Sequence, residues 1–137
     1  MKRVILVLLA AICLSTAAYA ESVWFNAYSY SIKYKNSYNR NNSSGWSSAE
    51  KCSVPIEFRM DEDVIVIYSN KTQIYAIYEN AGTYNDSDGG KQQGYYVIDQ
   101  DYDKGMIRLR IARDGTSQLY VDFNDVAWVY NVVRRQS

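Results

Sequence analysis

The sequence predicts an all-β fold, an antiparallel meander of about eight strands that closes into a small barrel. Short apolar segments rich in β-branched and aromatic residues alternate with runs of Asn, Asp, Ser and Gly, which is the composition of strands and turns. No apolar repeat of helical period lasts beyond a turn or two after residue 20. A β-sandwich is the alternative, but a closed barrel is favoured because it leaves no sheet edge exposed.

The first twenty residues have the pattern of a secretory signal peptide. Two basic residues precede an apolar stretch at 4–14, and Ala18-Tyr19-Ala20 has the small-x-small form that signal peptidase accepts. The apolar stretch is too short to span a bilayer. We therefore expect a signal peptide at 1–20, export to the periplasm or the exterior, and a single barrel domain at 21–137 that is not inserted in a membrane.

The expected strands follow one another along the rest of the chain. Aromatic residues recur over 22–34, and an Asn- and Ser-rich loop covers 36–45. Residues 46–52 are expected to form at most a short edge segment. The segment 55–60 alternates between apolar and charged residues, which is the period of a half-buried strand. Further strands are expected at 64–68, 72–79, 95–100, 106–113, 116–123 and 126–133, with turns at 61–63, 69–71, 101–105, 114–115 and 124–125 and a long loop at 80–94.

The hairpin signal is strongest at Asp114-Gly115, which lies between two alternating segments. A tight turn there requires a positive φ at Gly115. Eight strands joined by such short connections are typical of lipocalin-like and avidin-like barrels.

Acidic residues gather at one end of the predicted barrel, because successive turns of a meander alternate between its two ends. Asp61, Asp63, Asp86 and Asp88 fall in the turn 61–63 and the loop 80–94. Carboxylates are the ligands that calcium prefers, so these four are weak calcium candidates. The spacing of an EF-hand loop is not met, and acidic residues are also common in solvated turns. We therefore expect no metal and no cofactor.

Composition limits the chemistry of the chain. There is no histidine, so a Ser-His-Asp or Cys-His mechanism is excluded. Removal of the signal leaves Cys52 as the one cysteine, which excludes an internal disulfide. The charge is near neutral, which gives no electrostatic reason to expect nucleic acid. No pair of inward-facing acids is evident, because Glu57 and Asp122 lie opposite the apolar faces of their segments. An enzyme is therefore not expected.

Aromatic residues are abundant, with thirteen tyrosines and three tryptophans after residue 20. Most are expected in the core, but Trp46 and Tyr102 fall in connections at the end opposite the acidic turns. Rings beside amide and hydroxyl groups suit sugars and polar protein surfaces. Trp46 and Tyr102 are therefore the predicted ligand-binding residues.

Several strand patterns resemble a known group of proteins. The runs VIVIYS at 64–69 and QIYAI at 73–77, together with GTSQLYVDF at 115–123 and WVYNV at 128–132, are similar to those of small, uncharacterised, exported β-rich proteins of Bacteroides-type bacteria. The similarity extends over 46–133 and rests on strand patterns. It implies an exported β-rich protein and assigns no functional residue.

The function expected from these observations is that of an exported, non-enzymatic protein that binds a glycan, a small molecule or a protein partner. The alternative is a periplasmic inhibitor or immunity-type protein that blocks the active site of another protein with a projecting loop. A hollow barrel favours a small-molecule ligand, whereas a filled barrel with a projecting loop favours the inhibitor.

Overall fold

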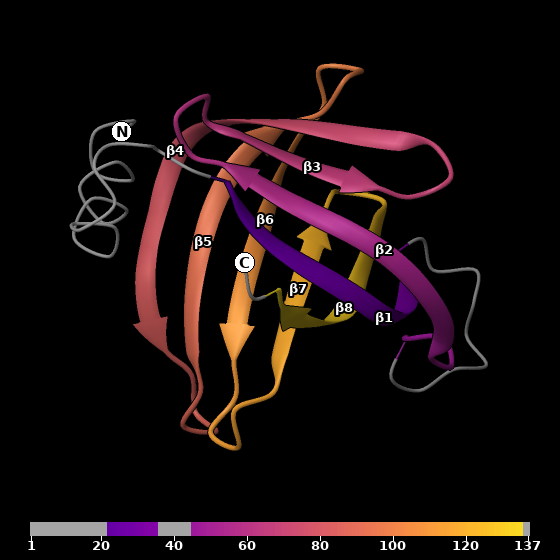
Figure 1. Cartoon of the computed structure of the whole chain (residues 1–137), viewed down its shortest axis with the longest axis vertical. Helices are drawn as coiled ribbons and strands as arrows, with labels where there is room; N and C mark the ends of the chain where they lie inside the picture. The colour runs from indigo at the N-terminus through magenta and orange to yellow at the C-terminus, as the bar shows by residue number, and fades with distance from the viewer. Residues whose placement is uncertain (1–21, 36–44, 136–137) are drawn as a thin grey trace.

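The computed structural model describes residues 22–35 and 45–135, and within them the chain is an all-β, closed, eight-stranded barrel (Figure 1). Each strand pairs antiparallel with the next, and β8 pairs with β1 to close the barrel. The described residues contain no helix that is long and apolar enough to cross a bilayer. The strands are β1 (Val23–Tyr34), β2 (Glu50–Arg59), β3 (Val64–Tyr68), β4 (Thr72–Asn85), β5 (Lys91–Ile98), β6 (Lys104–Ile111), β7 (Ser117–Asp122) and β8 (Val126–Arg134).

The longest strand, β4, belongs to two parts of the barrel. Figure 1 shows that it runs first beside β3 and then bends to run beside β5. The register of β4 on β5 shifts between Ile77 and Glu79 and again between Asn80 and Gly82. Such irregularities are β-bulges, which bend a strand and increase its twist. They allow one strand to turn the corner of a small barrel.

The same bulges explain the main error in the expected strands. The segment 80–94 was expected to be a loop, but β4 continues to Asn85 and β5 begins at Lys91. Bulges break the alternation of apolar and polar residues, and Gly82 pairs with Gly94, so this hairpin has the composition of a loop. The edge segment expected at 46–52 is likewise wrong, because residues from Glu50 onward belong to the long strand β2.

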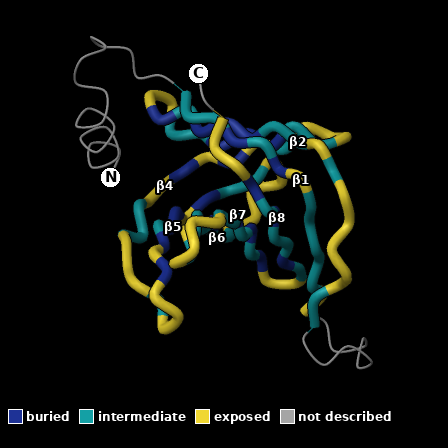
Figure 2. Tube along the Cα trace, turned by 60° about the horizontal axis from the view of Figure 1, so that its bottom comes forward, coloured by how far each residue is buried: buried dark blue, intermediate teal, exposed yellow. Residues whose placement is uncertain are grey.

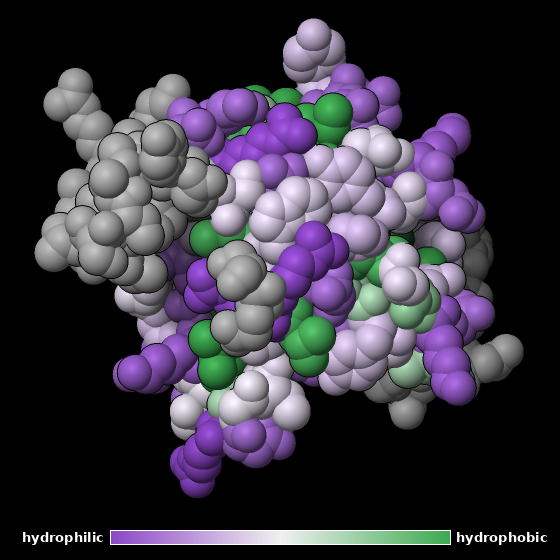
Figure 3. Space-filling view, in the orientation of Figure 1, coloured by the Kyte–Doolittle hydropathy of each residue, from purple (hydrophilic) through white to green (hydrophobic). Residues whose placement is uncertain are grey.

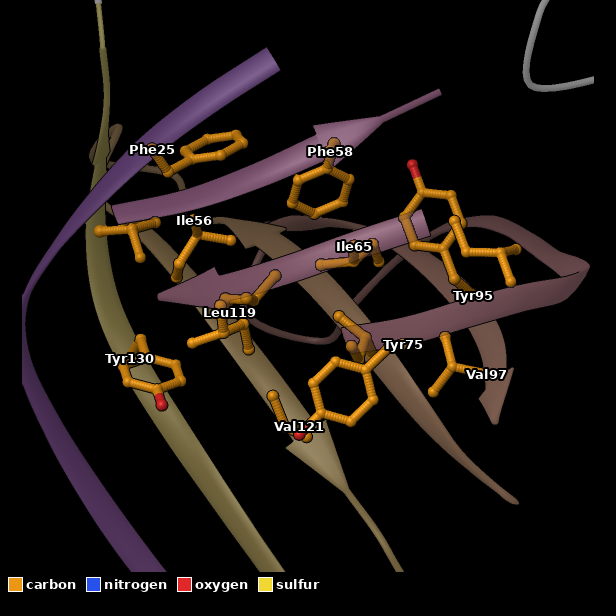
Figure 4. Close-up of a cluster of buried hydrophobic side chains, with 14 of the residues drawn as sticks. Phe25, Ile56, Phe58, Ile65, Tyr75, Tyr95, Val97, Leu119, Val121 and Tyr130 are labelled. Atoms are coloured by element: carbon orange, nitrogen blue, oxygen red, sulfur yellow. The ribbon is translucent and has the colours of Figure 1, made fainter. Parts of the chain in front are cut away.

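Apolar side chains from all eight strands fill the centre of the barrel (Figure 4). Ile56, Ile65, Ile107, Leu119 and Val121 are at most 1% exposed. Tyr75 and Tyr130 place their rings in the same cluster. Figure 2 shows the exposed residues mainly in turns and at strand ends, and Figure 3 shows a mostly hydrophilic outer face with small apolar patches. The residues that alternation places on the inner face of 55–60 and 106–113, such as Ile56, Phe58 and Ile107, are buried, as expected.

Three of the hairpins have the same turn. In the turns Asp86–Gly90, Asp99–Asp103 and Ala112–Thr116, the fourth residue donates its N–H to the carbonyl of the first, and the first donates to the carbonyl of the fifth. The fourth residue has a positive φ in each, at Gly89, Tyr102 and Gly115. This is a type I turn followed by a left-handed residue. The hairpin expected at Asp114-Gly115 is confirmed, with Gly115 in the left-handed conformation.

We expect Gly115→Val to destabilise the protein by about 1 kcal/mol or more, because φ at Gly115 is +91° and a β-branched residue is strained there. Nothing lies within 4 Å of an added Cβ, so the cost comes from the backbone alone. Urea unfolding of both proteins measures it, and an unchanged midpoint contradicts this turn geometry.

Candidate functional site

A row of polar residues crosses the outside of the barrel. Neighbouring members are direct register partners. On β7 and β8 the residues next to them in the sequence, Leu119, Tyr130 and Val132, belong to the buried core. Because adjacent strands are about 4.8 Å apart, six strands give the row a length of roughly 24 Å. We call these residues the outer row: Tyr84 (β4), Gln92 (β5), Arg110 (β6), Gln118 (β7), Asn131 (β8) and Ser29 (β1).

Hydrogen bonds link the outer row from end to end through the carboxylate of Asp86. On the β4 side, Tyr84 donates to Gln92 at 2.9 Å, and Gln92 donates to Asp86 at 3.2 Å. Arg110 donates to Asp86 at 2.7 Å and also to Gln118 at 3.2 Å. The row continues as Gln118 donates to Asn131 at 3.3 Å and Asn131 donates to Ser29 at 2.8 Å. The planar side chains are therefore held in fixed orientations before any ligand arrives.

An aromatic and cationic cluster lies beside the outer row. Arg108 is the register partner of Tyr120, and its guanidinium lies 4.5 Å from the centre of the Tyr120 ring. Trp46 packs edge-on against the same ring, with centroids 6.2 Å apart. Lys33 places its ammonium 5.7 Å from the centre of the Trp46 ring. Trp46, one of the two predicted binding residues, is thus part of the outer surface next to the row.

Asp86 anchors this surface and the β4–β5 turn together. One carboxylate oxygen accepts from Arg110 and Gln92, and the other accepts from the backbone N–H of Asp88 and Gly90. The ion pair with Arg110 and these hydrogen bonds hold the pKa of Asp86 well below its usual range. Its oxygens are therefore occupied by donors of the chain itself.

The four weak calcium candidates are not brought together as a metal site. Within residues 22–35 and 45–135, no group of three or more Cys, Asp or Glu side chains is placed to hold a metal ion. Asp61 and Asp63 belong to the β2–β3 turn, whereas Asp86 and Asp88 belong to the β4–β5 turn and contact Arg110. The acidic turns have a structural use, because Asp86 and Asp99 each accept two backbone N–H groups within their own turn.

We expect the ion pair of Asp86 to make stability depend on pH. A carboxylate whose pKa is lower in the folded state stabilises the fold above its unfolded pKa, near 4, and this contribution is lost as the pH falls further. The free energy of unfolding should therefore decrease below about pH 5. In Asp86→Asn the free energy of unfolding should be lower than in the wild-type protein at neutral pH, and it should decrease less on acidification. Urea unfolding at several pH values measures both effects. The control is Asp101→Asn, at an exposed turn position; an equal change in both variants contradicts the assignment.

Tyr102, the second predicted binding residue, lies apart from this surface. Figure 1 shows the β5–β6 turn well separated from the end of β1 and the start of β2, and Trp46 lies between these two strands in the sequence. Tyr102 is 87% exposed and has a φ of +66° at the position where the two related turns have glycine. Trp46 and Tyr102 are therefore not brought together, and a binding role for Tyr102 stays a prediction.

Because tyrosine is disfavoured in the left-handed region, we expect Tyr102→Gly to stabilise the protein by about 0.5 kcal/mol, after allowing for the greater freedom of glycine in the unfolded chain. Asp101→Gly is the matched control, since its φ is not positive, and it should destabilise. Thermal unfolding of both variants measures these changes in stability. If Tyr102→Gly is destabilised, the Tyr102 ring contributes to the stability of the fold and the prediction is wrong.

Two hollows lie on the described part of the barrel, and only the second is lined by members of the row, Tyr84 and Gln92. The first, which we call the tyrosine groove, has a volume of about 270 Å³ and is flanked by Tyr78, Tyr96 and Lys104. The second, which we call the mouth groove, has a volume of about 380 Å³. It lies at the end of the barrel where β4 ends and β5 begins, and its apolar side is formed by Leu109 and by Ile111, which is 50% exposed.

A comparable aromatic cluster on another part of the outer surface is tied to a buried acid. Trp24 stacks on Tyr68 with centroids 5.7 Å apart, and Arg135 lies 4.8 Å from the centre of the Trp24 ring. Glu57, only 7% exposed, accepts hydrogen bonds from Tyr68 at 2.7 Å and from Arg59 at 2.9 Å. This cluster provides a matched control for Trp46, Tyr120 and Arg108.

Of the residues on this surface, the sequence identified Trp46 as a binding residue and Asp86 only as a calcium candidate. The alternation that places Arg108 and Arg110 opposite the apolar face is visible in the sequence, but their alignment with Gln92, Gln118 and Asn131 depends on register. Register is set by pairing between strands and by bulges, so no motif along the chain signals the row.

Comparison with known proteins adds no assignment to this geometry. No protein-family model, no curated protein and no solved structure matches the chain.

Proposed function

We propose that the chain is an exported, non-enzymatic binding protein that holds a glycan against the outer row and the adjacent Trp46–Tyr120 pair. The observation that carries the proposal is the unbroken row of hydrogen-bonded amide, guanidinium and hydroxyl groups beside two packed aromatic rings. Such groups offer hydrogen bonds to sugar hydroxyls, and the rings offer rigid apolar area.

The packing of the barrel supports a site on the outside. Core side chains such as Ile65, Ile107 and Leu119 are at most 1% exposed, so the centre is occupied by the protein's own residues. The outer row is in turn ordered by its own hydrogen bonds, which lowers the conformational entropy that binding has to overcome.

The experiment is a glycan array followed by calorimetric titration of the best ligand. We expect Tyr120→Ala to weaken binding by about tenfold or more, because a central packed ring is the usual place of a binding hot spot. Trp24→Ala removes a ring from the comparable cluster around Glu57 and should leave affinity unchanged. If no glycan binds, or if Trp24→Ala weakens binding while Tyr120→Ala does not, the proposal is wrong.

A second candidate is small-molecule binding in the mouth groove. The observation that favours it is an inward-facing side chain, Ile111, that is half exposed in a hollow of about 380 Å³. Mouths of β-barrels are frequent ligand sites, and this volume lies near the lower end of their usual range. The probe is the fluorescent dye 1-anilinonaphthalene-8-sulfonate: Ile111→Ser should reduce its binding, whereas Ile74→Ser, on the outer face of β4, should not.

A further inference from the structure

We infer that the glycan held by the outer row is an anionic one, whose carboxylate or sulfate groups are recognised by Lys33, Lys104 and Arg108. This inference rests on the proposed function and names the class of ligand. What carries it is the balance of charge on the outer surface that includes the row, the aromatic pair and the tyrosine groove.

Two carboxylates of this surface, Asp86 and Asp122, are already paired, whereas Glu79, the exposed register partner of Tyr96, forms no ion pair among the described residues. Asp86 binds Arg110 at 2.7 Å, and Asp122 pairs with Lys35. Both side chains of the Asp86–Arg110 pair are largely buried, with exposed fractions of 17% for Arg110 and 15% for Asp86. These pairs leave neither Arg110 nor Lys35 as a surplus charge.

Three further cations of this surface form no ion pair within the part of the chain that the structure describes. They lie over aromatic rings: Lys33 over Trp46 at 5.7 Å, Arg108 over Tyr120 at 4.5 Å, and Lys104 over Tyr78 at 5.5 Å. A ring attracts a cation through its quadrupole but does not neutralise it. Each of the three therefore presents an uncompensated positive charge next to apolar ring area.

The positions of the three cations suit a chain-like ligand. Arg108 and Lys104 are four residues apart on the same face of β6, which places them about 13 Å from each other along the strand. Between them, Met106 pairs with Tyr96 and with Asp122 across the neighbouring strands, and Lys104, Tyr96 and Met106 all line the tyrosine groove. A sugar ring in this groove would have its anionic substituent within reach of Lys104, while further units of the glycan extend toward Arg108.

The test compares charged polymers with their neutral counterparts by calorimetry. The carboxylate arm uses polygalacturonate against its full methyl ester, and the sulfate arm uses dextran sulfate against dextran. We expect at least one charged polymer to bind about tenfold or more tightly than its neutral counterpart, and the preference to shrink at high salt because exposed charges are screened. A single-stranded oligonucleotide is a third arm and should bind more weakly than that polymer.

Substitutions test whether Lys33, Lys104 and Arg108 cause the preference for charged polymers. Lys33→Gln combined with Lys104→Gln should abolish most of the preference and leave the fold intact, because these two side chains have no ion pair among the described residues. Lys71→Gln combined with Arg134→Gln removes the same charge at other exposed positions and should leave the preference unchanged. Arg108→Gln should reduce the preference further, and Arg108→Lys should restore part of it.

The outcomes separate the inference from the proposed function. Equal binding of charged and neutral glycans overturns the anionic class and leaves glycan binding standing. An oligonucleotide that binds as tightly as the sugars, or a control pair as damaging as Lys33→Gln with Lys104→Gln, overturns the inference in favour of unspecific polyanion binding. Absence of binding to every sugar overturns both.

Discussion

Leu119→Ala should destabilise the barrel by about 3 kcal/mol, because it removes a fully buried side chain and leaves a cavity that the surrounding strands cannot close. Leu119 is 1% exposed, and its register partners Leu109 and Tyr130 also face the interior. Chemical denaturation measures the loss. The control is Ile111→Ala, another inward-facing residue but 50% exposed, which should cost about 1 kcal/mol or less.

This result bears on function as well as on stability. A loss below about 1 kcal/mol at Leu119 means that the centre is loosely packed, and a loosely packed centre would favour a ligand inside the barrel. A loss of the expected size supports a filled barrel whose ligand has to bind outside or at the mouth.

Gly105→Ala should destabilise the protein by about 2 kcal/mol, because the position has no room for a Cβ. An added Cβ would lie 2.7 Å from the carbonyl oxygen of Asp122 and 2.7 Å from the ring of Phe123. The oxygen belongs to the backbone of the neighbouring strand β7, so it cannot move aside as the end of a flexible side chain can.

Gly82→Ala is the control for Gly105→Ala. Gly82 has open space around it, so its replacement is strained by a φ of +90° alone. Both alanine variants should be destabilised, but for different reasons. Gly105→Ser should be as damaging as Gly105→Ala, because the position has no room for any side chain. Gly82→Asn should be better tolerated than Gly82→Ala, because asparagine adopts positive φ more readily. Urea unfolding measures all four, and a neutral Gly105→Ala contradicts the close packing of Phe123 on β6.

The fold was largely predictable from the sequence, and the exceptions have identifiable causes. Alternation in 55–60 and 106–113 places Ile56 and Ile107 inside the barrel, as observed. The expectation failed at 80–94, where bulges interrupt the alternation, and at Gly105, which was assigned to a turn but pairs with Val97 within the sheet. Glycine next to a large ring inside a barrel and glycine in a turn look alike in a sequence.

The candidate surface was much less predictable. Its members come from strands β1 and β4 to β8 and from the β1–β2 connection, and only pairing across strands brings them into contact. Trp46 was identified from its aromatic character, but its partner Tyr120 was not, since residues 46 and 120 become neighbours only in the folded barrel. Topology predicts that Tyr102 and Trp46 lie at the same end of the barrel. It does not give their positions around the circumference of the barrel, and these positions differ.

The most direct test of glycan binding at the outer row is an NMR titration of the labelled protein with the tightest ligand from the array, followed through side-chain amide signals. We predict that the amide signals of Gln92, Gln118 and Asn131 shift or broaden together, whereas that of Gln73, which faces the interior near Tyr75, stays unchanged. Shifts confined to the turn at 99–103 or to the mouth groove, with Gln118 and Asn131 unaffected, would contradict the account.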